Sequence, residues 1–370
     1  PTAFQRLAEK LGADPDLDTM ILDVFAADQS PEAIERLHEA LASHYAHLRN
    51  AATQRLRDMG GKSVPVLIGN LRHDDPDLHI HTLNVLGDIR DGAAIPAIRK
   101  LLFNEPKDAN VRFAAYEVLG CLPVEKGAIT LAAGLHDPVP NVRTAAASAI
   151  NNNYAPVLAA GLKNMVREAS EETTQIAQAV VEGECDRIFL GLVTEPAFEE
   201  TIVRMLSVEA HEAVREHFQR LLREDGQTEL ADRLGSVAPA PKREVLKVFA
   251  VDDSRMILSI YRSVLHKLGL EPQLFEFPAK AIANVQRVRP DVILTDLNMP
   301  EISGIELTRQ VRQWFTPEQM PIVMVTTQNE SQDNEAALAA GVNQILNKPF
   351  TERSIGQALE AVGIALPERG

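Results

Sequence analysis

The sequence predicts a multidomain chain in which an all-α superhelical solenoid is followed by an α/β domain with a doubly wound parallel sheet. Residues 1–234 contain amphipathic helical patterns and almost no strand signal, whereas residues 244–370 alternate apolar strands with helical stretches. Between them, residues 235–243 place Pro239 and Pro241 among small residues, a composition typical of a semi-rigid linker. A chain of 370 residues is also too long for one ordinary core.

The overall composition is that of a soluble globular protein, with 45% hydrophobic and 24% charged residues. The sequence has no apolar run of about 18 residues and no basic leader followed by an apolar stretch, so we expect neither a membrane partner nor a secretory signal. Cys121 and Cys185 are too few and too far apart for a disulfide framework. We therefore expect a cytoplasmic protein.

The negative charge is concentrated in the first part of the chain. Residues 1–240 hold 23 Lys and Arg against 36 Asp and Glu, a balance of −13, while residues 241–370 hold 14 against 16. A field of this sign repels phosphate backbones, so nucleic acid is not an expected partner. No helix-turn-helix signature flanks the α/β domain, which also disfavours a DNA-binding role.

A weak internal repeat supports the solenoid prediction. The aligned apolar positions lie 30, 33 and 31 residues apart, and they are Leu48, Leu78, Val111 and Val142. A second amphipathic stretch follows each of them after a break, so every unit has two helices, as in α-solenoids. The frame resembles HEAT-like repeats across residues 45–165. Residues 1–44 and 165–234 are predicted to be helical, without a clear repeat frame.

Three arginines recur in this frame, at Arg49, Arg112 and Arg143. We interpret them as solvated side chains or as partners of acidic residues in the preceding unit. A row of arginines that binds a ligand is the less favoured interpretation.

Four apolar strands of the α/β domain each end at a charged or hydroxyl residue. The residues that follow them are Asp252 with Asp253, Asp296, Thr326, and Lys348 with Pro349. In a doubly wound sheet, ligands bind outside the carboxyl ends of the strands, so these side chains are predicted to share one site. Three unpartnered carboxylates raise one another's pKa, and a hard divalent cation such as Mg²⁺ resolves this conflict. The set predicts a phosphorylatable aspartate on a magnesium ion.

Residues 245–365 resemble, from end to end, a receiver domain of the two-component response regulators. The resemblance implies a five-stranded, flavodoxin-like fold and a role for each matched residue. Asp252 and Asp253 match metal-binding acids, and Asp296 matches the phosphoacceptor and a further metal ligand. Thr326 matches the switch hydroxyl and Lys348 the signalling lysine.

Further positions follow from the same resemblance. The backbone carbonyl of Asn298 matches a metal ligand, and its side chain matches a position facing the phosphoryl group. A cis bond is expected before Pro349, and Gly304 fits the turn that opens the next helix. The family often has an aromatic residue three positions before the lysine, where this chain has Ile345. Signalling by aromatic rotation is therefore not expected here.

The resemblance implies a phosphorelay response regulator in which Asp296 accepts a phosphoryl group from a cognate histidine kinase with Mg²⁺. Because the helical region shows no catalytic cluster, we expect phosphorylation to switch its interactions with an unknown protein partner. Dimerisation on phosphorylation stays open. Beyond self-catalysed phosphotransfer and dephosphorylation, no enzyme activity is expected. The alternative is an enzymatic output in the helical region, phosphatase- or lyase-like and gated by the receiver, which a deep polar pocket on the concave face would favour.

Overall fold

The computed structural model describes residues 2–12, 14–43, 45–123, 128–209, 212–235, 246–299, 302–326 and 331–367. Most of the predicted linker, residues 235–243, lies outside these described residues. Helices fill the first part, and a parallel sheet with helices fills the second. None of the helices in the described ranges is both long and apolar enough to cross a membrane.

The first part consists of α-helices joined by short turns. They are α1 (Ala3–Ala8), α2 (Pro15–Asp28), α3 (Pro31–Ala40), α4 (Ala46–Met59), α5 (Val64–Asn70), α6 (Pro76–Ile89), α7 (Ile95–Phe103), α8 (Ala109–Cys121), α9 (Ala128–Ala133), α10 (Pro140–Asn152), α11 (Pro156–Met165), α12 (Glu171–Glu182), α13 (Asp186–Leu192), α14 (Pro196–Arg204), α15 (Glu212–Glu224) and α16 (Thr228–Gly235). Proline at the first or second position starts many of them, since its fixed φ suits a helix start and its missing N–H is not needed there.

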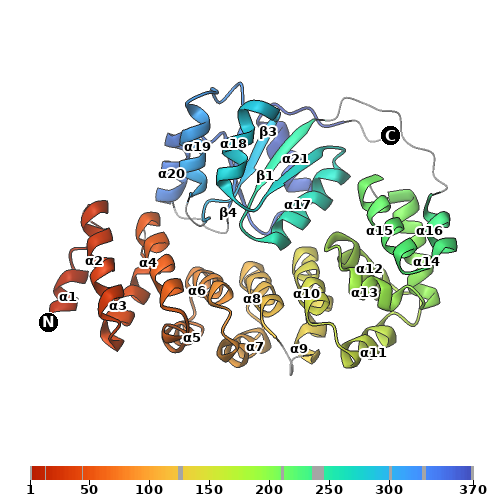
Figure 1. Ribbon diagram of the computed structural model, residues 1–370, viewed down its shortest axis with the longest axis horizontal. Helices are drawn as coiled ribbons and strands as arrows, with labels where there is room; N and C mark the ends of the chain where they lie inside the picture. Colours follow the sequence, from red (N-terminus) through yellow and green to blue (C-terminus); the bar gives the residue numbers. More distant parts are fainter. Residues whose placement is uncertain are drawn as a thin grey trace.

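These helices form an arc of two layers, as Figure 1 shows. Helices α6, α8, α10 and α12 line the inner, concave side, where each contacts the next, and α5, α7, α9 and α11 lie outside. Helices α8 and α10 approach closely through small buried residues such as Ala115, Ala145 and Ala149. The predicted all-α solenoid is confirmed.

Two of the recurring arginines are buried and the side chain of the third, Arg112, is 15% exposed, so their interpretation as solvated side chains was wrong. Arg49 is 1% exposed and Arg143 is 7% exposed. In each of the three units, the guanidinium donates at 2.7 Å to the carbonyl oxygen six residues earlier: Arg49 to Ser43, Arg112 to Pro106 and Arg143 to Asp137. Each of these arginines therefore stabilises the turn that precedes its inner helix. The predicted pairing with acidic residues of the preceding unit is seen in altered form for Arg112. This arginine forms an ion pair with Asp137, which belongs to the turn that follows its own unit.

Replacing Arg112 by Met should reduce the free energy of unfolding by about 3 kcal/mol, because Asp137, whose side chain is 7% exposed, loses its charged partner. Urea unfolding of the full chain measures this loss. The matched control is Arg223→Met, which removes an ion pair whose side chains are 53% and 71% exposed and should change stability by less than about 0.5 kcal/mol. Equal losses in the two variants would contradict a structural role for the arginine row.

The second part alternates strands and helices. Its elements are β1 (Lys247–Val251), α17 (Arg255–Lys267), β2 (Glu271–Phe275), α18 (Pro278–Val288), β3 (Val292–Thr295), α19 (Gly304–Arg312), β4 (Ile322–Thr326), α20 (Ser331–Ala340), β5 (Gln344–Asn347) and α21 (Glu352–Ala361). All strand pairs are parallel, in the order β2-β1-β3-β4-β5. This is the five-stranded doubly wound sheet that the sequence predicted. Strand β2, at one edge and only partly buried, has no apolar run of its own.

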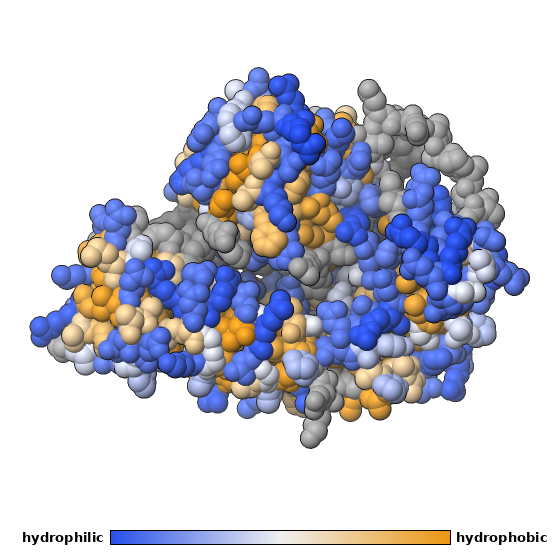
Figure 2. All heavy atoms as spheres, viewed as in Figure 1, coloured by the Kyte–Doolittle hydropathy of each residue, from blue (hydrophilic) through white to orange (hydrophobic). Residues whose placement is uncertain are grey.

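The sheet sits in the concavity of the helical arc (Figure 1). One hydrophobic cluster runs without a break from the solenoid through α17 and α21 to one face of the sheet. A second cluster, under α18, α19 and α20, fills the opposite face. In Figure 2, hydrophilic side chains cover much of the helical part on the visible face, and hydrophobic ones show mainly in patches between them. The first of the two hydrophobic clusters shows that the helical part and the sheet domain share one apolar core.

Candidate functional site

The candidate site lies at the carboxyl edge of the sheet, where β1 and β3 deliver two carboxylates. Strand β1 is buried at its last four residues, β3 throughout, and the two are neighbours in the sheet. Asp252 is 1% exposed and Asp296 is 7% exposed. The chain holds each in place locally, because Asp252 accepts from the backbone N–H of Ser254 and Asp296 from that of Asn298, at 2.9 and 3.0 Å.

Lys348, which follows β5, lies between these two carboxylates. Its Nζ is 2.7 Å from Asp252 Oδ2 and 2.9 Å from Asp296 Oδ1, and its side chain is 10% exposed. The peptide bond to Pro349 is cis, as predicted. Within the described residues, no group of three or more His, Cys, Asp and Glu side chains is placed to hold a metal ion as it stands. One ammonium group thus neutralises part of the acidic cluster.

The raised pKa values of the carboxylates in this cluster arise mainly from burial. Burial raises the pKa of Asp252 to about 6, against the opposing pull of Lys348. Burial, together with Asp252 and Asp296, holds the pKa of Asp253 well above its ordinary value. Burial by itself would lower the pKa of Lys348, but the two carboxylates outweigh it and raise that pKa strongly. The buried carboxylates thus outnumber the ammonium group of Lys348.

The other residues predicted for the site lie around Asp252, Asp296 and Lys348. Asp253 and Asn298 line the same cleft as Asp296, and the side-chain carbonyl oxygen of Asn298 is buried without a hydrogen-bond partner. Thr326 ends β4, beside β3, and is 2% exposed. Ile345 lies in β5 and packs against the hydrophobic cluster under α18, α19 and α20.

Gly304 has a steric reason to be glycine. A Cβ atom at this position would lie 2.0 Å from the backbone oxygen of Asp296. Its N–H donates to the carbonyl of Leu297 at 3.0 Å, and Ser303 caps the helix that begins there. The start of α19 therefore rests directly on the backbone of Asp296.

The solenoid forms the opposite wall of the site. A cleft of about 1150 Å³ separates the two parts and is lined by residues of α4, α6, α8 and α10 together with the acidic cluster. Ser254 Oγ donates to Glu117 of α8, and Asn141 of α10 donates to the carbonyl of Phe350, two residues after Lys348. Helical residues thus contact the loops that carry Asp252 and Lys348.

Glu117 and Ser254 were not predicted from the sequence. The repeat frame contains a signal for Glu117, because the sixth residue after each aligned apolar position is polar and lines the cleft. These residues are Gln54, Asn84, Glu117 and Ser148. Only one of them is acidic, and it faces the sheet domain. Burial raises the pKa of Glu117 to about 7, and the nearby carboxylates of Asp252 and Asp296 raise it further, against Ser254 and Lys348.

This shift predicts a pH-dependent stability. The folded state binds a proton at Glu117 more tightly than the unfolded state, whose pKa is near 4.5, so stability falls as pH rises from about 4.5 through about 7. Glu117→Gln should be more stable than the natural chain by up to about 3 kcal/mol at pH 8, and the two should converge near pH 4.5. Urea unfolding in EDTA at three pH values measures this. Glu224→Gln, at an exposed position, should show no such trend, and an unchanged pH dependence in the Glu117 variant would contradict the assignment.

The sheet order, with acids after β1 and β3 and a lysine after β5, defines the class of two-component receiver domains. Sequence comparison agrees with this geometry. Residues 248–360 match the family described as response regulator receiver domain, and residues 64–151 match HEAT repeats. The chain belongs to the response regulator family through this receiver domain, which follows a HEAT-repeat region.

Individual relatives match the receiver part alone. Chemotaxis protein CheY1 of Helicobacter pylori is 36% identical over 122 residues, which are 32% of this chain and 96% of that protein. The KDP operon transcriptional regulatory protein KdpE of Escherichia coli is 31% identical over 119 residues, 32% of this chain and 50% of that protein. The solved chemotaxis response regulator CheY4 of Vibrio cholerae is 33% identical, covering 32% of this chain and 98% of its own, with a TM-score of 0.31. These relatives are named for different processes, and each match covers about a third of this chain.

Proposed function

We propose that this response regulator accepts a phosphoryl group on Asp296 from a histidine kinase and passes the signal to its HEAT-repeat region. The contact that carries the proposal is Lys348 between Asp252 and Asp296, at an edge of the sheet that also touches Glu117 and Asn141 of the solenoid. One site therefore combines an acceptor, a mobile cation and a direct connection to the output region.

In this proposal, an oxygen of the Asp296 carboxylate attacks the phosphorus of the phosphohistidine. The new oxygen–phosphorus bond forms as the phosphorus–nitrogen bond breaks, and the imidazole leaves with the electron pair. The Lys348 ammonium then turns from Asp252 to a phosphoryl oxygen, and the Thr326 hydroxyl donates to another. Both movements draw groups at the ends of β4 and β5 toward Asp296.

The residues present fit Mg²⁺. Asp252, Asp253 and Asp296, with the backbone carbonyl of Asn298, are the hard oxygen ligands that this ion prefers, and the raised pKa values of Asp252 and Asp253 show that burial makes their charged forms costly without a further cation. When bound, Mg²⁺ supplies charge that offsets the negative oxygens of the transferring phosphoryl group. Lys348 is then no longer required as the partner of Asp252.

The coupling can be tested by solution scattering of the full chain. We expect the radius of gyration to change when beryllium trifluoride and Mg²⁺ are added together, because the loops around Asp296 support the contacts of Ser254 and Phe350 with the solenoid. The Asp296→Asn variant should show no change under the same conditions. An unchanged profile for the natural chain would contradict coupling between the two domains.

The alternative of an enzymatic output gains little from the cleft. The helical part contributes to it an ion pair between Arg57 and Asp88, and His81, whose pKa burial lowers to about 4. These groups are poorly suited to acid–base catalysis near neutral pH, and Glu117, whose pKa of about 7 would suit it, accepts a hydrogen bond from Ser254 of the receiver. We therefore favour an interaction partner as the output.

A further inference from the structure

Helix α17 differs in charge from the rest of this acidic protein. The chain has a formal net charge of −15, yet residues 254–267 contain no acidic residue and carry Arg255, Arg262 and Lys267. Apolar residues such as Ile257, Tyr261 and Leu265 occur between them and are buried. The segment is therefore a basic amphipathic helix.

The solenoid meets this helix with acidic side chains. Arg262 forms an ion pair with Glu184, and Lys267 forms one with Glu182. Both carboxylates are largely shielded, with side chains 21% and 12% exposed. Their partners Arg262 and Lys267 are 39% and 35% exposed, so these pairs are partly screened by salt but lose less of their attraction than fully exposed ones. The contacts therefore favour a basic over an acidic partner.

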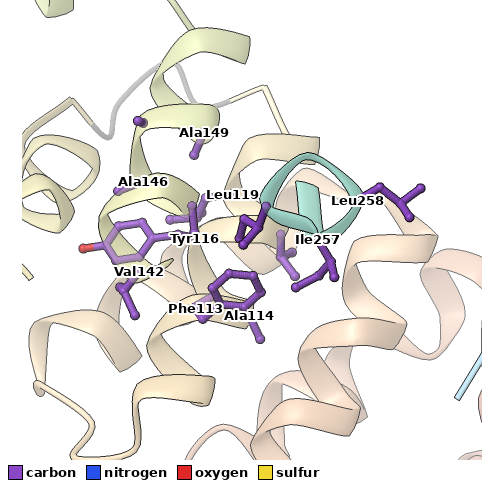
Figure 3. Packing of buried hydrophobic residues seen from close by; sticks show 14 of the residues in the cluster. Phe113, Ala114, Tyr116, Leu119, Val142, Ala146, Ala149, Ile257 and Leu258 are labelled. Carbon is purple, nitrogen blue, oxygen red and sulfur yellow. The ribbon is translucent and has the colours of Figure 1, made fainter. Parts of the chain in front are cut away.

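Apolar side chains of the solenoid also pack against α17. Ile257 lies beside Phe113 and Ala114 of α8, as Figure 3 shows. Helices α10 and α12 also contact α17. We define the α17 groove as the surface formed by Phe113, Ala114, Glu117, Glu182 and Glu184. It has an apolar floor at one end and an acidic rim at the other, the pattern of grooves that take an amphipathic helix.

We propose that the α17 groove is the partner-binding surface of the HEAT-repeat region, and that its partner is a protein presenting a basic amphipathic helix. In the closed chain, α17 fills the groove. When the receiver moves away, the groove is left with exposed apolar surface and with two carboxylates that have lost their cationic partners Arg262 and Lys267, and a helix of the same chemistry replaces both kinds of contact. The inference rests on the proposed function only in that phosphorylation drives the separation.

A labelled peptide of residues 254–268 serves as the probe, with fluorescence anisotropy on the full chain as the readout. We expect the chain with beryllium trifluoride and Mg²⁺ to bind it at least about tenfold more tightly than the untreated chain. The matched control peptide carries Arg262→Glu and Lys267→Glu and should bind at least about tenfold more weakly, with a difference that shrinks as salt is added. Equal binding of both peptides would overturn the proposal.

A charge exchange makes the test specific to the groove. The full chain with Glu182→Lys and Glu184→Lys should prefer the charge-reversed peptide, provided that its thermal unfolding shows an intact fold. If that chain unfolds, Glu184→Lys alone with a peptide carrying Arg262→Glu gives the same comparison. Failure of both exchanges to reverse the preference would place the peptide elsewhere.

Opening the chain by mutation separates this inference from the proposed function. Arg262→Glu with Lys267→Glu in the full chain removes both ion pairs without touching the phosphorylation site. This variant can bind the natural-sequence peptide while the beryllium-treated natural chain does not. That result would support the α17 groove as the binding surface and contradict phosphorylation as the signal that opens it. If scattering shows that the chain opens but neither chain binds the peptide, the α17 groove is contradicted as the binding surface, and the proposed phosphorylation switch is retained. Sedimentation showing a dimer that excludes the peptide would identify a second copy as the occupant and overturn the proposal.

Discussion

Asp296→Asn is expected to abolish phosphoryl incorporation, by at least about a thousandfold in initial rate. The amide lacks the anionic oxygen that attacks phosphorus, and no other described carboxylate lies within hydrogen-bonding distance of both Lys348 and the N–H of Asn298. Acetyl phosphate with Mg²⁺ is a suitable donor, and intact-protein mass spectrometry detects the added phosphoryl mass.

Asp291→Asn provides the matched control, because it changes the same residue type at the start of β3 rather than after its end. Asp291 accepts from the N–H of Lys247 at 2.7 Å, far along the strand from the site. This variant should incorporate phosphate at the natural rate. Incorporation that persisted in Asp296→Asn would move the acceptor to another side chain, with Asp252 and Asp253 the first to examine.

Lys348→Met is expected to reduce the free energy of unfolding by about 3 kcal/mol in EDTA, because it leaves Asp252 and Asp296 buried beside each other without a cation. Mg²⁺ should restore more stability to this variant than to the natural chain, since the ion replaces the lost charge. Denaturant unfolding across a Mg²⁺ titration measures both effects. Lys247→Met, at an exposed position of β1, should cost less than about 0.5 kcal/mol and show no added response to Mg²⁺.

The loss in Lys348→Met should also depend on pH. The pKa of Asp252 is already about 6, above its usual value, and removing the lysine raises it further. A carboxyl group whose folded pKa is raised binds a proton more tightly when folded, so the folded state is favoured as pH falls through that value. The variant should therefore lose less stability at pH 5 than at pH 8. A loss that did not vary with pH would show that the lysine contributes by packing rather than by charge.

The sequence predicted the sheet well because each central strand is a continuous apolar run that ends at a polar residue. Strands β1, β3 and β4 are buried on both faces, which leaves their pattern unmistakable. Strand β2 gave no such signal, because an edge strand with Glu271, Pro272 and Gln273 is stabilised by its pairing with β1 rather than by its own burial. The resemblance to receiver domains was needed to predict it.

The sequence predicted which side chains lie at this edge of the sheet but not how they pair. The order of the strands places Asp252, Asp296 and Lys348 at one edge, yet sequence does not decide whether a lysine or a metal ion neutralises the two acids. The contribution of Glu117 was out of reach for another reason. It depends on how the solenoid curves around the receiver, and a repeat frame gives the period of a solenoid without its curvature. The interpretation of the arginine row was wrong for a different reason. A charged side chain can be buried when it donates hydrogen bonds to loop carbonyls, and the sequence period does not reveal such bonds.

The hydrophobic cluster that continues from the solenoid into α17 and α21 bears on how this protein melts. Two domains joined only by a linker unfold as separate events, each with its own heat absorption. Here, one face of the sheet shares its apolar neighbours with the repeats, so removing the solenoid uncovers Ile257, which lies beside Phe113 and Ala114. The unit of cooperative unfolding therefore crosses the boundary between the two folds, and heating the resting chain should give one calorimetric transition. Activation, by parting the domains, should split it into two.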